Sequence, residues 1–162
     1  TELYDIDMAD NLYAAASHTK EMLNDINRFR LKNPGIESYY NTGVLLYFLD
    51  RIRQEVKKDD ILDFIRENEN KLLLPDQDIL NGLYGHKILQ LPEKKYNYDA
   101  RFSVIYEGLR EDKYSLDRVM RNTSILHFCG RDKPWDPVII SRFVALYQHY
   151  QVLTERTLKE ID

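Results

Sequence analysis

The sequence predicts a mixed α/β fold, because short apolar runs alternate with charged segments whose apolar residues recur at helical spacing. Residues 41–49 (NTGVLLYFL) carry a continuous apolar run after a glycine, as in a strand that is buried on both faces. Shorter apolar runs at 12–16 and 86–92 are also expected to be strands. Residues 59–72 place apolar side chains at helical spacing between charges. Strands mixed with helices in this way indicate a sheet flanked by helices.

Three helices are expected before the chain's last segment. Residues 19–31 have roughly helical apolar spacing, and Asn-Pro-Gly at 33–35 ends the pattern. The segment 59–72 begins with an aspartate suited to a cap, and its apolar stripe consists of Ile61, Leu62, Phe64 and Ile65. Residues 75–85 begin with proline and acidic residues, which suit a first turn, and Gly85 is the expected stop.

The last expected helix covers residues 136–160. Asp136 is a suitable cap, and Pro137 suits the first helical position. An apolar stripe follows at steps of four and three: Ile139, Phe143, Leu146, Tyr150 and Leu153. Two heptads are too few to define a coiled coil, so we expect the stripe to pack on its own domain. The alternative is a homo-oligomer formed through this helix. The polar region 99–122 is expected to be a loop followed by a helix.

The overall composition is that of one globular domain of 162 residues, with 43% hydrophobic residues. The net charge of −4 gives no general attraction to nucleic acid or to anionic lipid. The apolar runs are too short to span a bilayer. Cys129 is the single cysteine, so an internal disulfide is excluded, which fits a cytoplasmic protein.

Four short pieces carry polar groups beside apolar runs: YYNTGVLL (39–46), LPDQDILN (74–81), KYNYDARFS (95–103) and LHFCGRDKPW (126–135). With TELYDIDMADN at the start of the chain, they resemble the C-terminal half of family 8 glycosyltransferases. These are retaining nucleotide-sugar enzymes related to bacterial lipopolysaccharide galactosyl- and glucosyltransferases and to glycogenin. The resemblance runs through most of the chain in the same order, and DQD and HFCG…KPW are its most specific parts.

The resemblance implies the C-terminal part of a GT-A fold and a metal-dependent site. It makes His127 a ligand of Mn²⁺, or of Mg²⁺ in its place, and gives Gly130 and Lys133 contacts to the donor diphosphate. The chemistry agrees, because imidazole is a suitable ligand for Mn²⁺ among other metals. A glycine lets the backbone approach a phosphate closely, and an ammonium supplies a compact positive charge.

The resemblance also assigns residues to the sugars. Asn41 and Thr42 are expected to contact the donor sugar. Asp76 and Gln77 are expected to bind its hydroxyls and to be the catalytic pair near the anomeric carbon. Carboxylates and amides suit vicinal hydroxyls because they accept, or accept and donate, in fixed directions. Asn97 is expected on the acceptor side. The implied reaction moves glucose or galactose from a UDP-sugar to a glycan or glycosylated-protein acceptor, with retention.

In the family, the metal-binding Asp-x-Asp motif precedes a segment that resembles the start of this chain. We therefore read Asp5 and Asp7 as belonging to the stretch after that motif. The chain is then one domain, residues 1–162, without the upstream nucleotide-binding half. We expect this chain to be inactive alone and the intact parent protein to be active in the cytoplasm. If the parent is membrane-associated, we expect it at the cytoplasmic face of the membrane.

Simpler interpretations stay open for several of these residues. His127 alone is typical of a buried or capping histidine, and Lys133 of a solvated loop charge. Asp78 is expected to cap a helix, Cys129 to fill a small buried space, and Trp135 to pack against the last helix rather than on a sugar. For the whole chain, the alternative is a catalytically inactive interaction module or a helical partner-binding protein.

Overall fold

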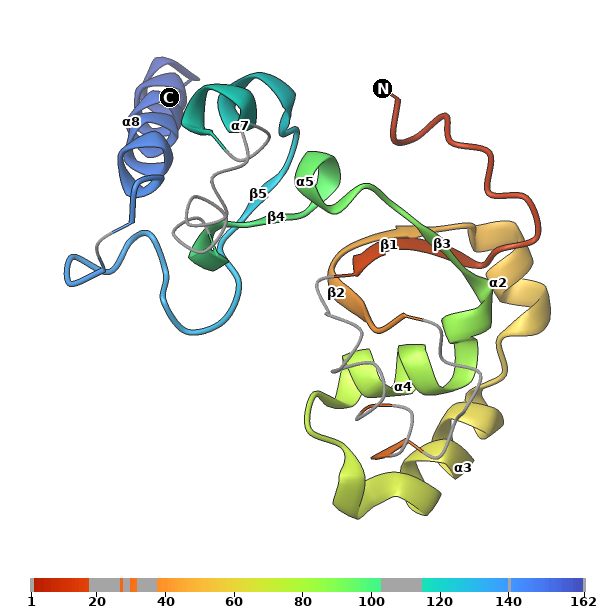
Figure 1. Cartoon of the computed structure of the whole chain (residues 1–162). Helices are drawn as coiled ribbons and strands as arrows, with labels where there is room; N and C mark the ends of the chain where they lie inside the picture. The colour runs from red at the N-terminus through yellow and green to blue at the C-terminus, as the bar shows by residue number, and fades with distance from the viewer. Residues whose placement is uncertain are drawn as a thin grey trace. The chain divides into compact units, whose positions relative to one another are not determined.

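The computed structural model describes residues 2–17, 27, 30–31, 38–102, 115–139 and 141–161. The chain divides into two compact units, Thr1–Glu93 (unit 1) and Lys94–Asp162 (unit 2). Each unit is described by itself, and Figure 1 gives the elements of both. The expected helix at 19–31 and the break at 33–35 lie outside the described residues, except for Asn27, Arg30 and Leu31.

Unit 1 is built on a mixed three-stranded sheet with the order β2-β1-β3. The central strand β1 (Tyr13–Ser17) runs antiparallel to β2 (Tyr40–Tyr47) and parallel to β3 (Ile88–Gln90). Three successive alanines of β1, residues 14–16, have no exposed surface, as expected for the middle strand of a covered sheet. The expected α/β class and mixed sheet are confirmed.

The prediction that residues 41–49 form a strand buried on both faces is wrong. Most side chains of β2 are only half-buried, and Gly43 and Tyr47 are exposed. The reason is that, among the described strands, β2 pairs with β1 alone and lies at the edge of the sheet. The strand also ends at Tyr47, earlier than expected, because the helix α2 (Leu49–Glu55) begins at the last residue of the predicted run.

Two helices of unit 1 match the sequence closely. The helix α3 (Lys58–Asn68) half-buries the expected stripe, and the short 3₁₀ turn η1 (Glu69–Lys71) follows it. Its N-cap is Lys57 without a side-chain hydrogen bond, so the expected aspartate cap is wrong. The helix α4 (Pro75–Tyr84) starts at the expected proline and ends just before Gly85, where the 3₁₀ turn η2 (Gly85–Lys87) begins.

The core of unit 1 lies between the sheet and α4. It contains the buried residues Leu12, Tyr13, Ala15, Tyr40, Leu80 and Ile88. A second cluster joins Leu31 and Tyr39 to Phe64 and Leu72, which attaches α3 to the start of β2. The first cluster packs α4 against β2, which positions the polar residues described below.

Unit 2 contains two short parallel strands, β4 (Tyr98–Asp99) and β5 (Leu126–His127), with Asp99 opposite His127. Its other elements are α5 (Glu93–Tyr96), which begins at the unit boundary, η3 (Ala100–Phe102), α7 (Leu116–Asn122) and α8 (Val144–Ile161). Tyr98, Ala100, Val119 and Phe143 form its buried core. The helix expected within 99–122 corresponds to α7, and residues 103–114 lie outside the described part.

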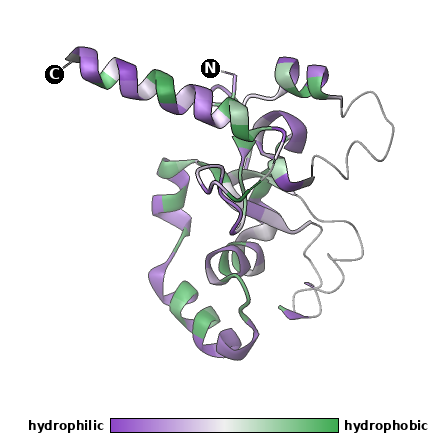
Figure 2. Cartoon of the chain, turned by 90° about the vertical axis from the view of Figure 1, so that its left-hand side faces the viewer, coloured by the Kyte–Doolittle hydropathy of each residue, from purple (hydrophilic) through white to green (hydrophobic). Residues whose placement is uncertain are grey.

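The last helix is shorter than the sequence indicated, because it begins at Val144 rather than at Asp136. The Asp136 carboxylate accepts a hydrogen bond from the Val138 amide at 3.0 Å, and this closes a local turn that does not continue as a helix. Along α8, hydrophilic and hydrophobic residues alternate (Figure 2). Phe143 is buried, but Tyr150 and Leu153 are 61% and 41% exposed, so the stripe packs only at its first turns.

Within the described residues, no helix has both the length and the apolar character needed to cross a bilayer.

Candidate functional site

Four of the predicted site residues lie together in unit 1, where β2 faces the first turn of α4. Gln77 Oε1 accepts hydrogen bonds from Asn41 Nδ2 at 3.2 Å and from the Thr42 amide at 3.4 Å. Thr42 Oγ1 donates to Asp76 Oδ2 at 2.9 Å. Asp76 is exposed and the other three are half-buried, so these donors and acceptors border solvent. We call these four residues the NTG–DQD cluster.

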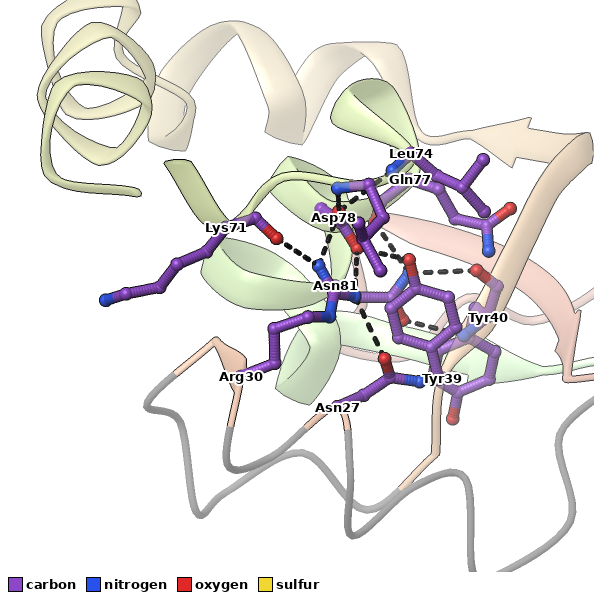
Figure 3. A network of polar contacts seen from close by, with 10 residues as sticks. Asn27, Arg30, Tyr39, Tyr40, Lys71, Leu74, Gln77, Asp78 and Asn81 are labelled. Atoms are coloured by element: carbon purple, nitrogen blue, oxygen red, sulfur yellow. Dashed lines mark hydrogen bonds and ion pairs between the residues drawn. The ribbon is translucent and has the colours of Figure 1, made fainter. Parts of the chain in front are cut away.

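A buried asparagine that the sequence reasoning missed holds the NTG–DQD cluster together. Asn81 Oδ1 accepts from the Tyr40 amide at 2.7 Å, and Asn81 Nδ2 donates to the carbonyl of Tyr40 at 2.8 Å. The same Nδ2 donates to the carbonyl of Gln77 at 2.8 Å (Figure 3). Asn81 has no exposed surface. Its amide thus ties α4 to the start of β2, one residue before Asn41.

Asp78 is the second anchor of this region, and it has no exposed surface. Its carboxylate accepts two hydrogen bonds from Arg30, at 2.7 and 2.6 Å, and one from the Tyr39 hydroxyl (Figure 3). The amides of Leu73 and Leu74 donate to it at 2.7 and 3.0 Å. These two amides lie at the start of α4, so the expected helix-capping role of Asp78 is confirmed.

The electrostatics of Asp78 follow from these donors. Burial alone would raise the pKa of Asp78, but the hydrogen bonds from Arg30, Tyr39 and the two amides outweigh it and lower the pKa. Burial and the neighbouring carboxylate raise the pKa of Tyr39, so the phenol stays neutral and donates. Because its oxygens are occupied by protein donors, Asp78 acts as an anchor, unlike the exposed Asp76.

In unit 2, His127 is the last residue of β5, and its ring contacts two side chains through Nδ1. Nδ1 lies 2.8 Å from Asn97 Oδ1 and 3.1 Å from Cys129 Sγ. Asn97 is fully buried. An amide oxygen only accepts, so the tautomer with the proton on Nδ1 is the one that bonds Asn97 Oδ1, and in it the lone pair is on Nε2. This is the tautomer and the support that a metal-ligating histidine needs.

Cys129 is buried beside His127, as expected for a small packing residue. Burial, and then the charge of Asp99, raise the pKa of the Cys129 thiol to about 12, so it is protonated at neutral pH and is a poor metal ligand. In the described part of the chain, no group of three or more His, Cys, Asp and Glu side chains could hold a metal ion. His127 therefore fits a metal as a single ligand, and further ligands would have to come from elsewhere.

The loop after β5 contains the two residues expected to contact a diphosphate. Gly130 has φ of +72°, a conformation that favours glycine. Lys133 Nζ donates to the carbonyl of Phe128 at 2.8 Å, which brings the ammonium back to the residue after His127. Trp135 is 63% exposed, and its ring lies 5.9 Å from that of Tyr147 on α8, so the predicted contact with the last helix is confirmed.

An ion pair that the sequence reasoning did not identify lies in the same loop region. Arg101 Nε donates to both carboxylate oxygens of Asp99, at 3.0 and 3.2 Å, and Nη2 donates at 2.6 Å. Asp99 has no exposed surface, whereas the Arg101 side chain is 42% exposed. The signal in the sequence was an acid and an arginine two residues apart at the end of a short strand. The name His127 loop is used below for His127–Lys133 together with Asn97, Asp99 and Arg101.

The N-terminal acids have a local structural role. Asp7 Oδ1 accepts from the Ala9 amide at 2.9 Å and closes a turn. The reading of Asp5 and Asp7 as lying outside a metal motif stays a prediction. A groove of about 720 Å³ lies between residues 4–9 and 46–53 of unit 1. Its lining includes none of the NTG–DQD residues.

Comparison with known proteins identifies the family. The model of glycosyl transferase family 8 matches residues 1–138. The chain belongs to glycosyl transferase family 8. Among curated relatives, it is 26% identical to General stress protein A of Bacillus subtilis, over 96% of this chain and 54% of that protein. It is 30% identical to Glycosyltransferase GlyF of Streptococcus pneumoniae, over 74% of this chain and 29% of that protein.

A lipopolysaccharide 1,2-glucosyltransferase of Escherichia coli is 30% identical over 60% of this chain and 29% of its own length. The chain thus spans about half or less of the curated relatives that it matches. Solved glycosyltransferase structures share the fold of this chain over part of their length. The galactosyltransferase LgtC, in complex with donor and acceptor sugar analogues, matches with a TM-score of 0.69 and 20% identity, over 91% of this chain and 54% of that one.

The glycosyltransferase GlyE of Streptococcus pneumoniae matches with a TM-score of 0.65 and 21% identity, over 99% of this chain and 39% of that one. These neighbours confirm the prediction of a partial GT-A fold. The family 8 membership also confirms the resemblance drawn from DQD and HFCG…KPW.

Proposed function

We propose that the intact protein is a metal-dependent hexosyltransferase of family 8 that uses a UDP-sugar. It transfers glucose or galactose to a glycan or glycosylated-protein acceptor with retention of configuration. The observation that carries the proposal is the hydrogen-bonded NTG–DQD cluster, in which Asn41 and Thr42 contact Gln77 and Asp76. Amide and carboxylate groups fixed at a solvent border suit recognition of the vicinal hydroxyls of a hexose.

In this function, the cluster binds the donor sugar, and Gln77 and Asp76 are the catalytic pair near its anomeric carbon. The hydrogen bonds from Asn41 and Thr42 orient the Gln77 side chain before a substrate arrives, which lowers the entropic cost of positioning it. The anchors Asn81 and Asp78 hold the backbone that carries these groups. Asp76, which is exposed, can exchange its Thr42 hydroxyl for a hydroxyl of the sugar at little cost.

The His127 loop binds the diphosphate in the same proposal. Gly130 lets the backbone approach a phosphate oxygen, and Lys133 exchanges its carbonyl partner for one. His127 would hold a Mn²⁺ or Mg²⁺ ion through its imidazole, and the contact of Nδ1 with Asn97 orients the ring. When it is bound, the metal supplies charge neutralisation for the departing diphosphate. Asn97 then supports His127, whether or not it also approaches the acceptor.

The test uses the whole gene product with UDP-glucose and UDP-galactose in the presence of Mn²⁺. We expect transfer or slow donor hydrolysis that depends on the metal. Gln77→Ala should lower kcat/KM by about 10–100-fold, the size of one or two hydrogen bonds made in the transition state. Gln90→Ala is the matched control, because Gln90 is an exposed glutamine of unit 1 outside the cluster.

His127→Ala should weaken Mn²⁺ binding, and the exposed His86→Ala is its control. The product's anomeric configuration, read by proton NMR, tests retention separately. If the whole gene product binds no UDP and consumes neither sugar nucleotide, the inactive interaction module becomes the better reading.

A further inference from the structure

We propose that Tyr39 is a positioning residue of the donor-sugar site, and that its hydroxyl fixes the orientation of the Gln77 side-chain amide. The inference rests on the proposed function, because Gln77 is there one of the catalytic pair. It deepens that function by connecting the carboxylate of Asp78, which has no exposed surface, to the group near the anomeric carbon.

The place of Tyr39 in unit 1 is the first observation. Tyr39 directly precedes β2 and is 5% exposed, and it belongs to the buried cluster with Leu31, Phe64 and Leu72. From there its hydroxyl reaches the first turn of α4 and donates to Asp78 Oδ1 (Figure 3). Because the apolar part of the ring is packed, the position of its oxygen is fixed.

The direction of the hydrogen bonds at this hydroxyl is the second observation. A tyrosine hydroxyl has one proton and two lone pairs. The ionised carboxylate of Asp78 only accepts, so the proton of Tyr39 points to it and the lone pairs face other groups. Burial and then the hydrogen bond to Asp78 raise the pKa of Tyr39, whereas hydrogen bonds from Gln77 and Arg30 act in the opposite direction. The phenol is neutral, and its oxygen accepts from Gln77.

The other end of the Gln77 amide agrees with this assignment. Gln77 Oε1 accepts from Asn41 Nδ2 at 3.2 Å and from the backbone amide of Thr42 at 3.4 Å. A backbone N–H can only donate, so the oxygen of Gln77 faces Thr42 and the nitrogen faces Tyr39. The two ends of an amide are nearly equal in size, so packing alone would not distinguish them. Their hydrogen-bond partners do.

The orientation of the amide determines what Gln77 presents to a bound sugar. An amide accepts at its oxygen and donates at its nitrogen, so half a turn of the group exchanges the two. An oxygen near the anomeric carbon stabilises positive charge that develops there, whereas an N–H group opposes it. Through Tyr39, the buried carboxylate of Asp78 keeps the oxygen of Gln77 on the side of Asn41 and Thr42.

A purely structural role for Tyr39 is the competing interpretation. In that case the hydroxyl is only one of several donors to Asp78, and its removal lowers stability without acting through Gln77. Tyr39→Phe removes the hydroxyl and keeps the packed ring, and the hydrogen bonds from Arg30 and from two backbone amides to Asp78 remain. Tyr84→Phe is the matched control. Tyr84 is a half-buried tyrosine of α4 whose hydroxyl has no hydrogen-bond partner among the described residues.

The experiment is a double-mutant cycle on sugar transfer by the whole gene product. We expect Tyr39→Phe to lower kcat by about 3–10-fold, as for the loss of one hydrogen bond, and Tyr84→Phe to leave it within about twofold. In the Gln77→Ala background, Tyr39→Phe should change kcat by less than about twofold, because the amide that it orients is absent. A loss by the same factor in both backgrounds, or an unchanged kcat in Tyr39→Phe, would overturn the proposal.

A second measurement needs no change at position 39. The side-chain amide protons of Gln77, identified in NMR spectra by their loss in Gln77→Ala, should exchange with solvent about tenfold more slowly than those of the exposed Gln90. Equal rates would overturn the proposal even if Tyr39→Phe does not fold. A wild-type protein that transfers no sugar would overturn the proposed function and this inference with it. That failure is distinct, because it appears without any substitution.

Discussion

The molecule uses the same buried pair, an aspartate with an arginine, in two regions and with opposite consequences. Asp78 in unit 1 and Asp99 in unit 2 both have no exposed surface, and each binds an arginine at 2.6 Å. Arg30 comes from 48 residues away and is 16% exposed, whereas Arg101 lies two residues from Asp99 and is 42% exposed. The first pair joins distant parts of unit 1, and the second holds a cation at the surface.

The difference lies in what else each carboxylate binds. Asp78 also accepts from the Tyr39 hydroxyl and from two amides at the start of α4. Its pair is therefore a junction of four segments of backbone. Asp99 accepts hydrogen bonds from the guanidinium and the amide of Arg101, only two residues along the chain. The pair of Asp78 links residues that are distant in the sequence, whereas the pair of Asp99 fixes the direction of a side chain two residues away.

Removing the Asp78 carboxylate should have the largest effect. Asp78→Ala leaves Arg30, a tyrosine hydroxyl and two amides without their acceptor, so we expect a loss of about 3–5 kcal/mol in the free energy of unfolding. Urea denaturation measures it. Asp76→Ala is the control on the same helix, and we expect a change within about 0.5 kcal/mol because Asp76 is exposed. Equal losses for the two variants would contradict the assignment of Asp78 as the anchor.

Lowering the pH should reproduce part of this loss in the free energy of unfolding. The pKa of Asp78 is lowered in the folded protein from its ordinary value of 3.8, so the unfolded chain takes up the proton first as the pH falls. The stabilisation is complete above about pH 4 to 5, and it is lost as the pH falls below 3.8 towards the lowered pKa. Urea titrations at several pH values measure this slope. In Asp78→Asn the slope should be smaller, and an unchanged slope would assign the acid sensitivity to other carboxylates.

In unit 2, the amide that supports His127 should affect metal affinity. Asn97→Leu removes the oxygen that holds Nδ1, and we expect Mn²⁺ affinity to fall by about 10–100-fold. Calorimetry or electron paramagnetic resonance of free Mn²⁺ measures it on the whole gene product. Asn68→Leu is the control, since Asn68 is a buried asparagine of unit 1 that bonds Phe64. An unchanged affinity in folded Asn97→Leu would contradict the role of Asn97 as the support of a metal-ligating His127.

Replacing Gly130 should have a smaller effect on stability, of about 1–2 kcal/mol. Gly130→Ala places a Cβ at a φ of +72° and 2.8 Å from the Arg101 guanidinium, which must move. Thermal denaturation measures the loss. Gly85→Ala is the matched control: its φ is −54°, and an added Cβ meets nothing within 4 Å, so we expect no loss or a slight gain. A stable Gly130→Ala with unchanged UDP affinity would remove the reason for a glycine in this loop.

Much of the fold could be predicted from local pattern. The stripe of α3 and the proline start of α4 identified those helices because apolar spacing and proline act within one turn. The start of α8 was misplaced because Asp136 and Pro137 suit a tight turn as well as a helix. The burial of β2 was misjudged because an apolar run does not reveal whether its strand is central or at an edge.

The sequence predicted the part of the candidate site in which the NTG motif faces the DQD motif. NTG and DQD were chosen separately, and the structure joins them by direct hydrogen bonds. The supports were not found, because Asn81 and Arg101 are ordinary polar residues whose partners are set by tertiary packing. Asn97 was chosen for the acceptor, and the structure adds its contact with the His127 ring. Its role at the acceptor stays a prediction.

Asn81 has one more consequence, for how unit 1 behaves among other proteins. The side-chain amide binds both the N–H and the C=O of Tyr40, as a neighbouring peptide group would. Among the described strands, β2 is at the border of its sheet, and a border strand can recruit foreign strands and aggregate. By capping the strand at its first residue, Asn81 shortens the stretch of backbone that an incoming chain could join.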